Sequence, residues 1–451
     1  MAVNQITLDD VPMCRFHLRV TAVTTGGMFI DGYILGMISI VLAVWGPQVG
    51  MSSLWEGLIG ASALAGIFVG ALVFGMLTDR VGRQAMFLAD LAAFIVFSAV
   101  QFFVTAPWQL AAIRLLMGVA IGADYAIGAA LLAEFLPRKQ RGPLLASLNA
   151  VWTLGYVVAF VVGYLMRGIG DNSWRWMLIS SVVPAVIVLS MRLGTPESPR
   201  WLAAHGREEE AQQVLRDTFG PHVVVGETPA KPPKAPLVEL FRPRWRKRTA
   251  FASLFWFCQV LPYFALFTFA PDVLKALGLS DEFTGGLVMN LFQLAGGVLG
   301  VIVMNKLSRR GFTIWSFVVL TLSLGVLGVV PSASAALVVI CFAVFAFVVS
   351  GAGNLETVYP SELFPTELRA TGVGFAAAMS RAGAAVGTFL LPMSIEHLGT
   401  QATMLIGTGV VLIGVIVSVA WAPDTRDLNL AEASGGGRAT TAVPVPATGD
   451  A

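Results

Sequence analysis

A few ionisable side chains stand inside long apolar stretches, and their chemistry is the first clue to function. Asp31 lies near the middle of one stretch, within GMFIDGYILGM, while Asp124 and Arg381 lie inside two others. A charged group is costly in hydrocarbon and there usually marks a pathway or a proton relay. A carboxylate can take up and release a proton, and a guanidinium can receive a carboxylate through two parallel hydrogen bonds. These residues therefore indicate proton transfer and anion binding within a membrane.

The composition requires a membrane setting. Of the 451 residues, 56% are hydrophobic and only 12% are charged, whereas soluble domains carry roughly 25% charge. The net charge of +2 does not favour a nucleic-acid partner. Three widely spaced cysteines argue against a disulfide framework or a metal site. The four histidines lie in expected termini or loops without catalytic pairing, so we expect no enzyme and no cofactor.

Twelve apolar stretches are long enough to cross a bilayer as helices, which takes about 20 residues each. The first is too long for a signal peptide, and we expect it to be an uncleaved span. The expected spans are 21–45, 54–77, 85–106, 108–134, 143–166, 175–193, 249–271, 284–305, 313–331, 335–360, 370–393 and 402–422.

This pattern predicts an all-α membrane protein in the inner (plasma) membrane, with two bundles of six helices. We expect a cytoplasmic N-terminus (1–20), an N-terminal bundle (21–193), a cytoplasmic loop (194–248), a C-terminal bundle (249–422) and a largely disordered cytoplasmic tail (423–451). Placing both termini in the cytoplasm puts most of the 29 Lys and Arg residues in cytoplasmic segments, as the positive-inside rule requires.

The two halves repeat one another. GMLTDRVGR after the second span corresponds to VIVMNKLSRR after the eighth, and EFLPRKQRG after the fourth corresponds to ELFPTELRA after the tenth. PES after the sixth span likewise corresponds to PDT after the twelfth. Such repeats are typical of secondary transporters, whose substrate site lies near the midplane between the repeated units.

These motifs resemble the major facilitator superfamily, in particular its branch of metabolite:proton symporters and sugar porters. The resemblance covers essentially residues 15–430 and implies alternating access by a protein that functions as a monomer. It also implies a cytoplasmic gate of acidic and arginine side chains that pair in one state and separate in the other; the alternative is that they only fix topology. The expected gate residues are Asp79, Arg80, Arg83, Glu134, Arg141, Glu362 and Arg369.

The expected depth of the buried charges defines a candidate site. At 1.5 Å of rise per residue, Asp31, Asp124 and Arg381 all fall near the middle of the bilayer. Arg114 resembles the fourth-span arginine that pairs with the first-span acid in proton-coupled sugar porters. Asp124 resembles the fourth-span acid of phosphate and organic-acid symporters. A static buried ion pair is the alternative, and Asp90 is left out because the third span is usually peripheral.

The resemblance also limits the substrate. Gln259 matches a sugar-binding glutamine, but Phe264 stands where sugar porters carry an asparagine, so polyol recognition is depleted. Arg381 is instead placed to receive a carboxylate. The remaining candidates for the substrate and proton pathway are Tyr33, Trp152, Tyr156, Tyr263, Asn290, Gln293 and Glu356.

We therefore expect a secondary transporter that uses the proton gradient to import a small organic acid, aromatic acids included. Its expected partners are a small-molecule substrate and the lipid bilayer. The alternatives are a sugar or polyol:proton symporter, a proton-coupled exporter of apolar compounds and a nutrient sensor that transports nothing.

Overall fold

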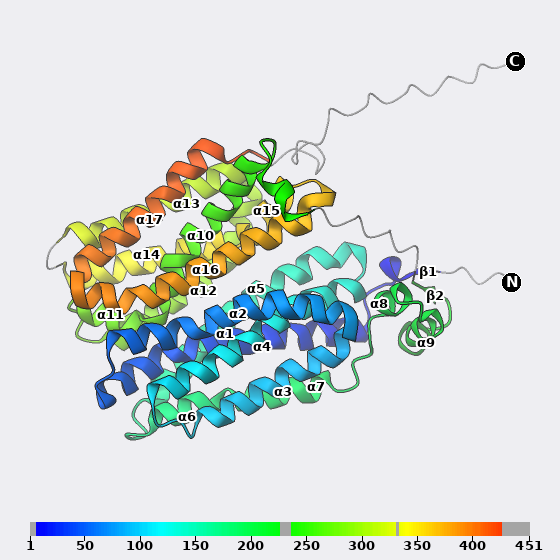
Figure 1. The fold of residues 1–451 in the computed structure, drawn as a ribbon, viewed down its shortest axis with the longest axis horizontal. Helices are drawn as coiled ribbons and strands as arrows, with labels where there is room; N and C mark the ends of the chain where they lie inside the picture. The colour runs from blue at the N-terminus through cyan, green and yellow to red at the C-terminus, as the bar shows by residue number, and fades with distance from the viewer. Residues whose placement is uncertain (1–5, 226–235, 331–332, 426–451) are drawn as a thin grey trace, which may run out of the picture.

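The computed structural model describes residues 6–225, 236–330 and 333–425. Within these ranges the side chains of Gly75, Met76, Asp79, Asn305, Thr357 and Thr366 are not described. The described chain forms two helical bundles that lie side by side (Figure 1). The segments expected to be disordered after residue 425 lie outside this part of the chain.

The N-terminal bundle contains six spans. Its helices are α1 (Arg15–Val49), α2 (Ser53–Val81), α3 (Arg83–Gln101), α4 (Pro107–Phe135), α5 (Arg138–Met166) and the pair α6 (Ser173–Ser180) and α7 (Val182–Arg192). The first span therefore begins at Arg15, earlier than expected, because the polar residues before the apolar run continue the helix.

The C-terminal bundle repeats this arrangement with six more spans. Its helices are α10 (Arg246–Thr268), α11 (Ala270–Ala276), α12 (Glu282–Lys306), α13 (Arg309–Val329), α14 (Ala335–Gly353), α15 (Leu355–Leu363), α16 (Thr366–Leu398) and α17 (Thr400–Trp421). Within the described residues, twelve helices, some of them broken, are long and apolar enough to cross a membrane. The tenth expected span is broken at Asn354, between α14 and α15, and the seventh is followed by a separate helix that begins beside Pro271.

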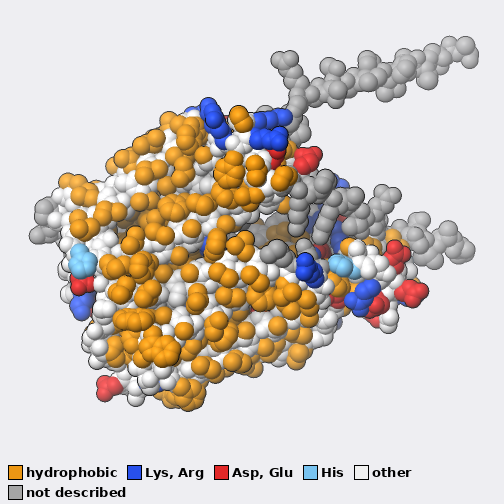
Figure 2. Space-filling model, viewed as in Figure 1, with side chains coloured by type: hydrophobic (Ala, Val, Ile, Leu, Met, Phe, Trp, Pro, Cys, Tyr) orange, Lys and Arg blue, Asp and Glu red, His pale blue; other side chains and the backbone are white. Residues whose placement is uncertain are grey.

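Close packing within the N-terminal bundle depends on glycine. Gly66 and Gly70 on α2 lie directly against Gly118 and Val119 on α4, where an added Cβ would collide with backbone atoms. Small residues spaced four apart allow such contact between helices in membranes. On the face that Figure 2 shows, hydrophobic side chains cover most of both bundles, as expected where lipid is the solvent.

A small unit sits at one end of the molecule, and we call this the α8–α9 end. It consists of β1 (Ile6–Thr7), the 3-10 helix η1 (Leu8–Asp10), α8 (Pro199–Ala204), α9 (Glu208–Phe219) and β2 (Val223–Val224), with β1 parallel to β2. Another 3-10 helix, η2 (Leu237–Phe241), precedes α10. Both ends of the described chain lie at the α8–α9 end (Figure 1), which the charge distribution predicts to be cytoplasmic.

The two bundles touch at the opposite end, near α11. Gly57 and Gly60 on α2 lie against Phe389 and Thr388 on α16, and α5 packs on α12. Toward the α8–α9 end, the surface is hollowed between the bundles (Figure 2). The residues at the middle of the interface therefore lie between a closed end and a hollowed end.

Candidate substrate and proton pathway

Three helices of the N-terminal bundle are joined by one buried arginine. Arg192, the last residue of α7, donates from Nη1 to both oxygens of Asp90 on α3, at 2.9 and 3.1 Å. Its Nη2 donates to Oδ1 of Asp124 on α4 at 2.8 Å. The three side chains are at most 1% exposed. Such charge-assisted hydrogen bonds are stronger than neutral ones, while Nε of Arg192 and Oδ2 of Asp124 have no partner among the described residues.

Asp31 lies beside this cluster but is not part of its hydrogen bonding. Gly27, one helical turn earlier on α1, lies directly against the Arg192 guanidinium and the Asp124 carboxylate. Asp31 is 0% exposed, and neither of its oxygens has a hydrogen-bond partner among the described residues. Its carboxylate interacts electrostatically with Asp124, Asp90, Arg192 and Arg381. A charged group is costly in such surroundings, and binding a proton removes that cost.

Two members of this cluster were missed by sequence reasoning. Asp90 was left out because the third span is usually peripheral. A carboxylate inside an apolar stretch is nevertheless as informative in the third span as Asp31 is in the first. Arg192 was counted among the cytoplasmic charges, because it stands at the very end of an apolar stretch. Its burial follows from the course of α7, which packs along α3 and α1.

The expected partnership of Arg114 with Asp31 is wrong in this structure. Arg114 is 1% exposed, and its Nε donates to the carbonyl of Ile59 on α2 at 3.3 Å. The side chain that interacts electrostatically with it is Tyr156 on α5. Asp124, expected at one depth with Arg381, instead takes Arg192 as its partner.

Aromatic side chains from both bundles meet in the middle of the interface. The Arg381 guanidinium on α16 lies 5.3 Å from the ring centre of Tyr125 on α4. Trp152 on α5 contacts Phe264 on α10, with ring centres 6.2 Å apart. Tyr156 likewise meets Phe267 at 6.1 Å. The site therefore has walls from both halves of the repeat.

Polar groups of the C-terminal bundle complete this site. The Trp256 indole donates to Oε2 of Glu356 at 2.7 Å, and Gln293 donates to the Tyr263 hydroxyl at 2.6 Å. The amides of Gln259 and Asn290 donate to the carbonyls of Val349 and Gly286. The side-chain carbonyl oxygens of Asn290 and Gln293 are buried, and no described residue donates a hydrogen bond to them.

Tyr33 lies apart from this group. Its hydroxyl bonds to Ser180 on α6 at 2.7 Å, so its polar end is used within the N-terminal bundle.

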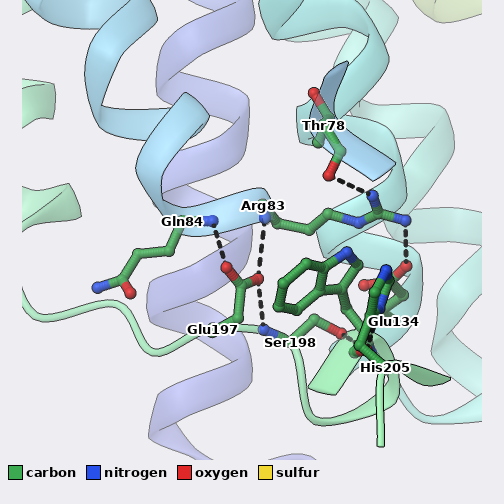
Figure 3. Close-up of polar contacts among 8 residues, drawn as sticks. Thr78, Arg83, Gln84, Glu134, Glu197, Ser198 and His205 are labelled. Carbon is green, nitrogen blue, oxygen red and sulfur yellow. Dashed lines mark hydrogen bonds and ion pairs between the residues drawn. The ribbon is translucent and has the colours of Figure 1, made fainter. Parts of the chain in front are cut away.

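Two of the expected gate residues, Arg83 and Glu134, belong to a polar network at the α8–α9 end (Figure 3). Arg83 donates to the carbonyl of Thr78 and to Oε1 of Glu134, each at 3.2 Å. The carboxylate of Glu197, in the PES motif, accepts from the backbone N–H groups of Arg83 and Gln84 at 3.0 and 3.1 Å. It thereby satisfies free donors at the start of α3, where a negative charge is favourable.

Other gate residues have partners that the repeat did not predict. Arg141 pairs with Asp9 from the N-terminal segment, and Arg200 of α8 donates to the same carboxylate at 2.7 Å. Glu362 lies 3.6 Å from Arg309 and accepts from Thr425 at 2.5 Å. Arg80 is exposed, Arg369 is partly buried, and the Asp79 side chain lies outside the described residues.

Two six-helix bundles with polar groups at their interface define a major facilitator transporter, a multi-pass protein of the inner membrane and not an enzyme. The chain belongs to the family "Sugar (and other) transporter", whose model matches residues 18–435. It is 40% identical to the inner membrane metabolite transport protein YgcS of Escherichia coli, over 97% of this chain and 98% of that one. It is also 40% identical to the putative metabolite transport protein YaaU of Escherichia coli, over 94% and 96% of the two chains.

A solved structure shares the fold. The partially occluded inward-open xylose transporter XylE from E. coli superimposes with a TM-score of 0.77 at 20% identity, over 92% of this chain and 100% of that one. At this level of identity the likeness concerns the fold.

Proposed function

We propose that this transporter imports a small organic acid together with protons, with Asp31 as the proton carrier and Arg381 as the group that binds the carboxylate. The observation that carries the proposal is the environment of Asp31, which is completely buried and has no hydrogen-bond partner in the part of the chain that the structure describes. The side chains of Asp90, Arg192 and Asp124 beside it are joined by ion pairs and supply a surrounding charge rather than a second acid without a counter-ion.

Arg381 can couple proton binding at Asp31 to substrate binding, because it interacts with Asp31 and also binds the substrate in this proposal. Arg381 interacts electrostatically with Asp31 in one bundle and with Glu356 in the other. A substrate carboxylate on Arg381 would neutralise the positive charge that Asp31 otherwise faces. Acid and proton would then bind more tightly together than separately, and this coupling is reciprocal by linkage.

The test is uptake by the full-length protein in liposomes that contain a pH-sensitive dye. Benzoates, nicotinate, short organic acids, phosphate, hexoses and inositol are added one at a time. Because undissociated acids cross bilayers unaided, protein-free liposomes set the baseline. Acidification above it by one acid, lost in Asp31→Asn and Arg381→Ala, supports the proposal. Asp217→Asn, an exposed change of the same type on α9, should transport like the wild type.

A sugar or polyol:proton symporter is the second candidate. It is favoured by the buried amides of Asn290 and Gln293, whose carbonyl oxygens lack partners and could accept from hydroxyl groups, and by the likeness to a xylose transporter. Acidification with hexoses or inositol alone would support this candidate and overturn the carboxylate-binding role of Arg381. No acidification with any solute would contradict proton-coupled import.

A further inference from the structure

The C-terminal bundle holds two opposite charges that share the site without pairing. Glu356 lies at the start of α15, just after the break in the tenth span, and Arg381 lies on α16. Their charges are close enough to interact. Among the residues that the structure describes, however, no ion pair or hydrogen bond joins them. This contrasts with Arg192, which bonds both neighbouring carboxylates.

Each of the two charged groups contacts one aromatic side chain. The Trp256 indole fixes Oε2 of Glu356 at 2.7 Å, and Oε1 has no hydrogen bond within the described chain. The Arg381 guanidinium lies over the Tyr125 ring, and none of its N–H groups donates a hydrogen bond there. One carboxylate oxygen and a whole guanidinium edge are therefore left for a ligand.

We propose that the substrate is amphoteric, with a carboxylate for Arg381 and a cationic nitrogen for Glu356. This inference rests on the proposed function and narrows its substrate class. A ligand with both charges would form an ion pair with each residue at once. A simple anion would leave Glu356 without a cation, and the two negative charges would repel each other.

The aromatic walls suit the same ligand. Trp152 and Tyr263 belong to the group of rings at the interface, and Tyr263 interacts electrostatically with Glu356 and Arg381. An aromatic face attracts a cation that has lost its water. The cationic end of the ligand would thus be received by rings as well as by the carboxylate.

Three probes of nearly equal shape test the proposal. They are 1-methylpyridinium-3-carboxylate, which has both charges, 3-methylbenzoate, which has only the negative charge, and 1-methylpyridinium-3-carboxamide, which has only the positive one. Calorimetric titration of the purified full-length protein compares their Kd values, and liposome uptake accompanies it. We expect the doubly charged probe to bind at least about tenfold more tightly than either of the others.

Two variants assign this preference to residues. Glu356→Gln should bring the Kd of the doubly charged probe to within about twofold of that of 3-methylbenzoate, because the cation loses its partner. Arg381→Gln should bring the Kd of the doubly charged probe to within about twofold of that of the carboxamide, because the carboxylate loses its partner. Asp217→Asn serves as the control, since it is exposed on α9, outside the interface, and should keep the wild-type order. A size-exclusion profile and a melting temperature check that each variant is folded.

The wild-type order alone decides the proposal if a variant fails to fold. Tighter binding of 3-methylbenzoate, with proton-coupled uptake, would overturn the amphoteric substrate and leave organic-acid import standing. Equal binding of the two carboxylates would do the same. If the organic acids of the liposome test and all three probes neither bind nor enter, both proposals are wrong.

Discussion

The two bundles descend from one repeated unit but treat their buried charges in opposite ways. In the N-terminal bundle, Asp90, Arg192 and Asp124 are paired at 2.8–3.1 Å and lie out of reach of solvent. In the C-terminal bundle, Glu356 and Arg381 are partly exposed and unpaired within the described chain. The first arrangement fixes three helices to one another, while the second leaves charges for a ligand.

Asp31 stands at the border between these arrangements. It lies against the paired cluster through Gly27 and yet interacts with Arg381 across the interface. In a transporter whose bundles rock against each other, a group at this position interacts with charges of both bundles. The comparison therefore predicts that charge removal has a structural effect in the cluster and a functional effect in the site.

Arg192→Gln should give the largest loss of stability. It leaves Asp90 and Asp124 buried without their positive partner, and removal of one member of a buried ion pair typically costs about 3–5 kcal/mol. Thermal unfolding in detergent, followed by size-exclusion chromatography, measures the loss.

The matched control for this variant removes the opposing charges as well. Adding Asp90→Asn and Asp124→Asn to Arg192→Gln should restore a large part of the stability, because no uncompensated charge then remains. If the single variant melts like the wild type, the cluster does not hold the bundle together and the contrast between the bundles fails.

Gly27→Ala should have the next largest effect. The new Cβ would meet the Arg192 guanidinium and the Asp124 carboxylate, whose ends are pinned by their ion pair and cannot move aside freely. Overpacking of this kind typically costs about 1–3 kcal/mol. Gly409→Ala on α17 is the control, since nothing lies within 4 Å of its added Cβ. Equal melting temperatures of the two variants would show that the cluster yields easily.

The sequence predicted the repeated architecture well because apolar length and charge asymmetry depend on the bilayer, which acts on each span separately. It also singled out Asp31, Glu356 and Arg381, since a charge within an apolar stretch is visible without a structure. Pairing was not visible in this way. Arg192 lies at the end of its stretch, and only the packing of α7 on α3 and α1 turns a residue that looks cytoplasmic into a buried counter-ion of Asp90 and Asp124.

Arg381→Gln should have a smaller effect on stability and a large effect on transport. The contact that the described structure gives its guanidinium is the Tyr125 ring at 5.3 Å, and such contacts contribute about 0.5–1 kcal/mol at partly exposed sites. We expect a nearly unchanged melting temperature and at least about a tenfold loss of uptake, as one charge-assisted contact to a substrate carboxylate is lost. Arg216→Gln, at an exposed position on α9, is the matched control. A large loss of stability in Arg381→Gln with uptake preserved would show that this C-terminal charge has a structural role and not a ligand-binding one.

The smallest effect concerns Asp9, which ties the N-terminal segment to α5 and α8 outside the membrane. Partial burial raises the pKa of Asp9, but the hydrogen bonds from Arg200 and Arg141 outweigh this, so that its pKa lies below the ordinary value of 3.8. A lowered carboxyl pKa stabilises the folded state above pH 3.8, and this contribution is lost as the pH falls through the folded-state pKa. Because all three side chains are partly exposed, 41% for Asp9, the contribution should stay below about 1 kcal/mol. Asp9→Asn should therefore melt slightly below the wild type at pH 5–7, and the difference should shrink toward pH 3. A difference that persists unchanged at pH 3 would mean that Asp9 acts by packing rather than by its charge.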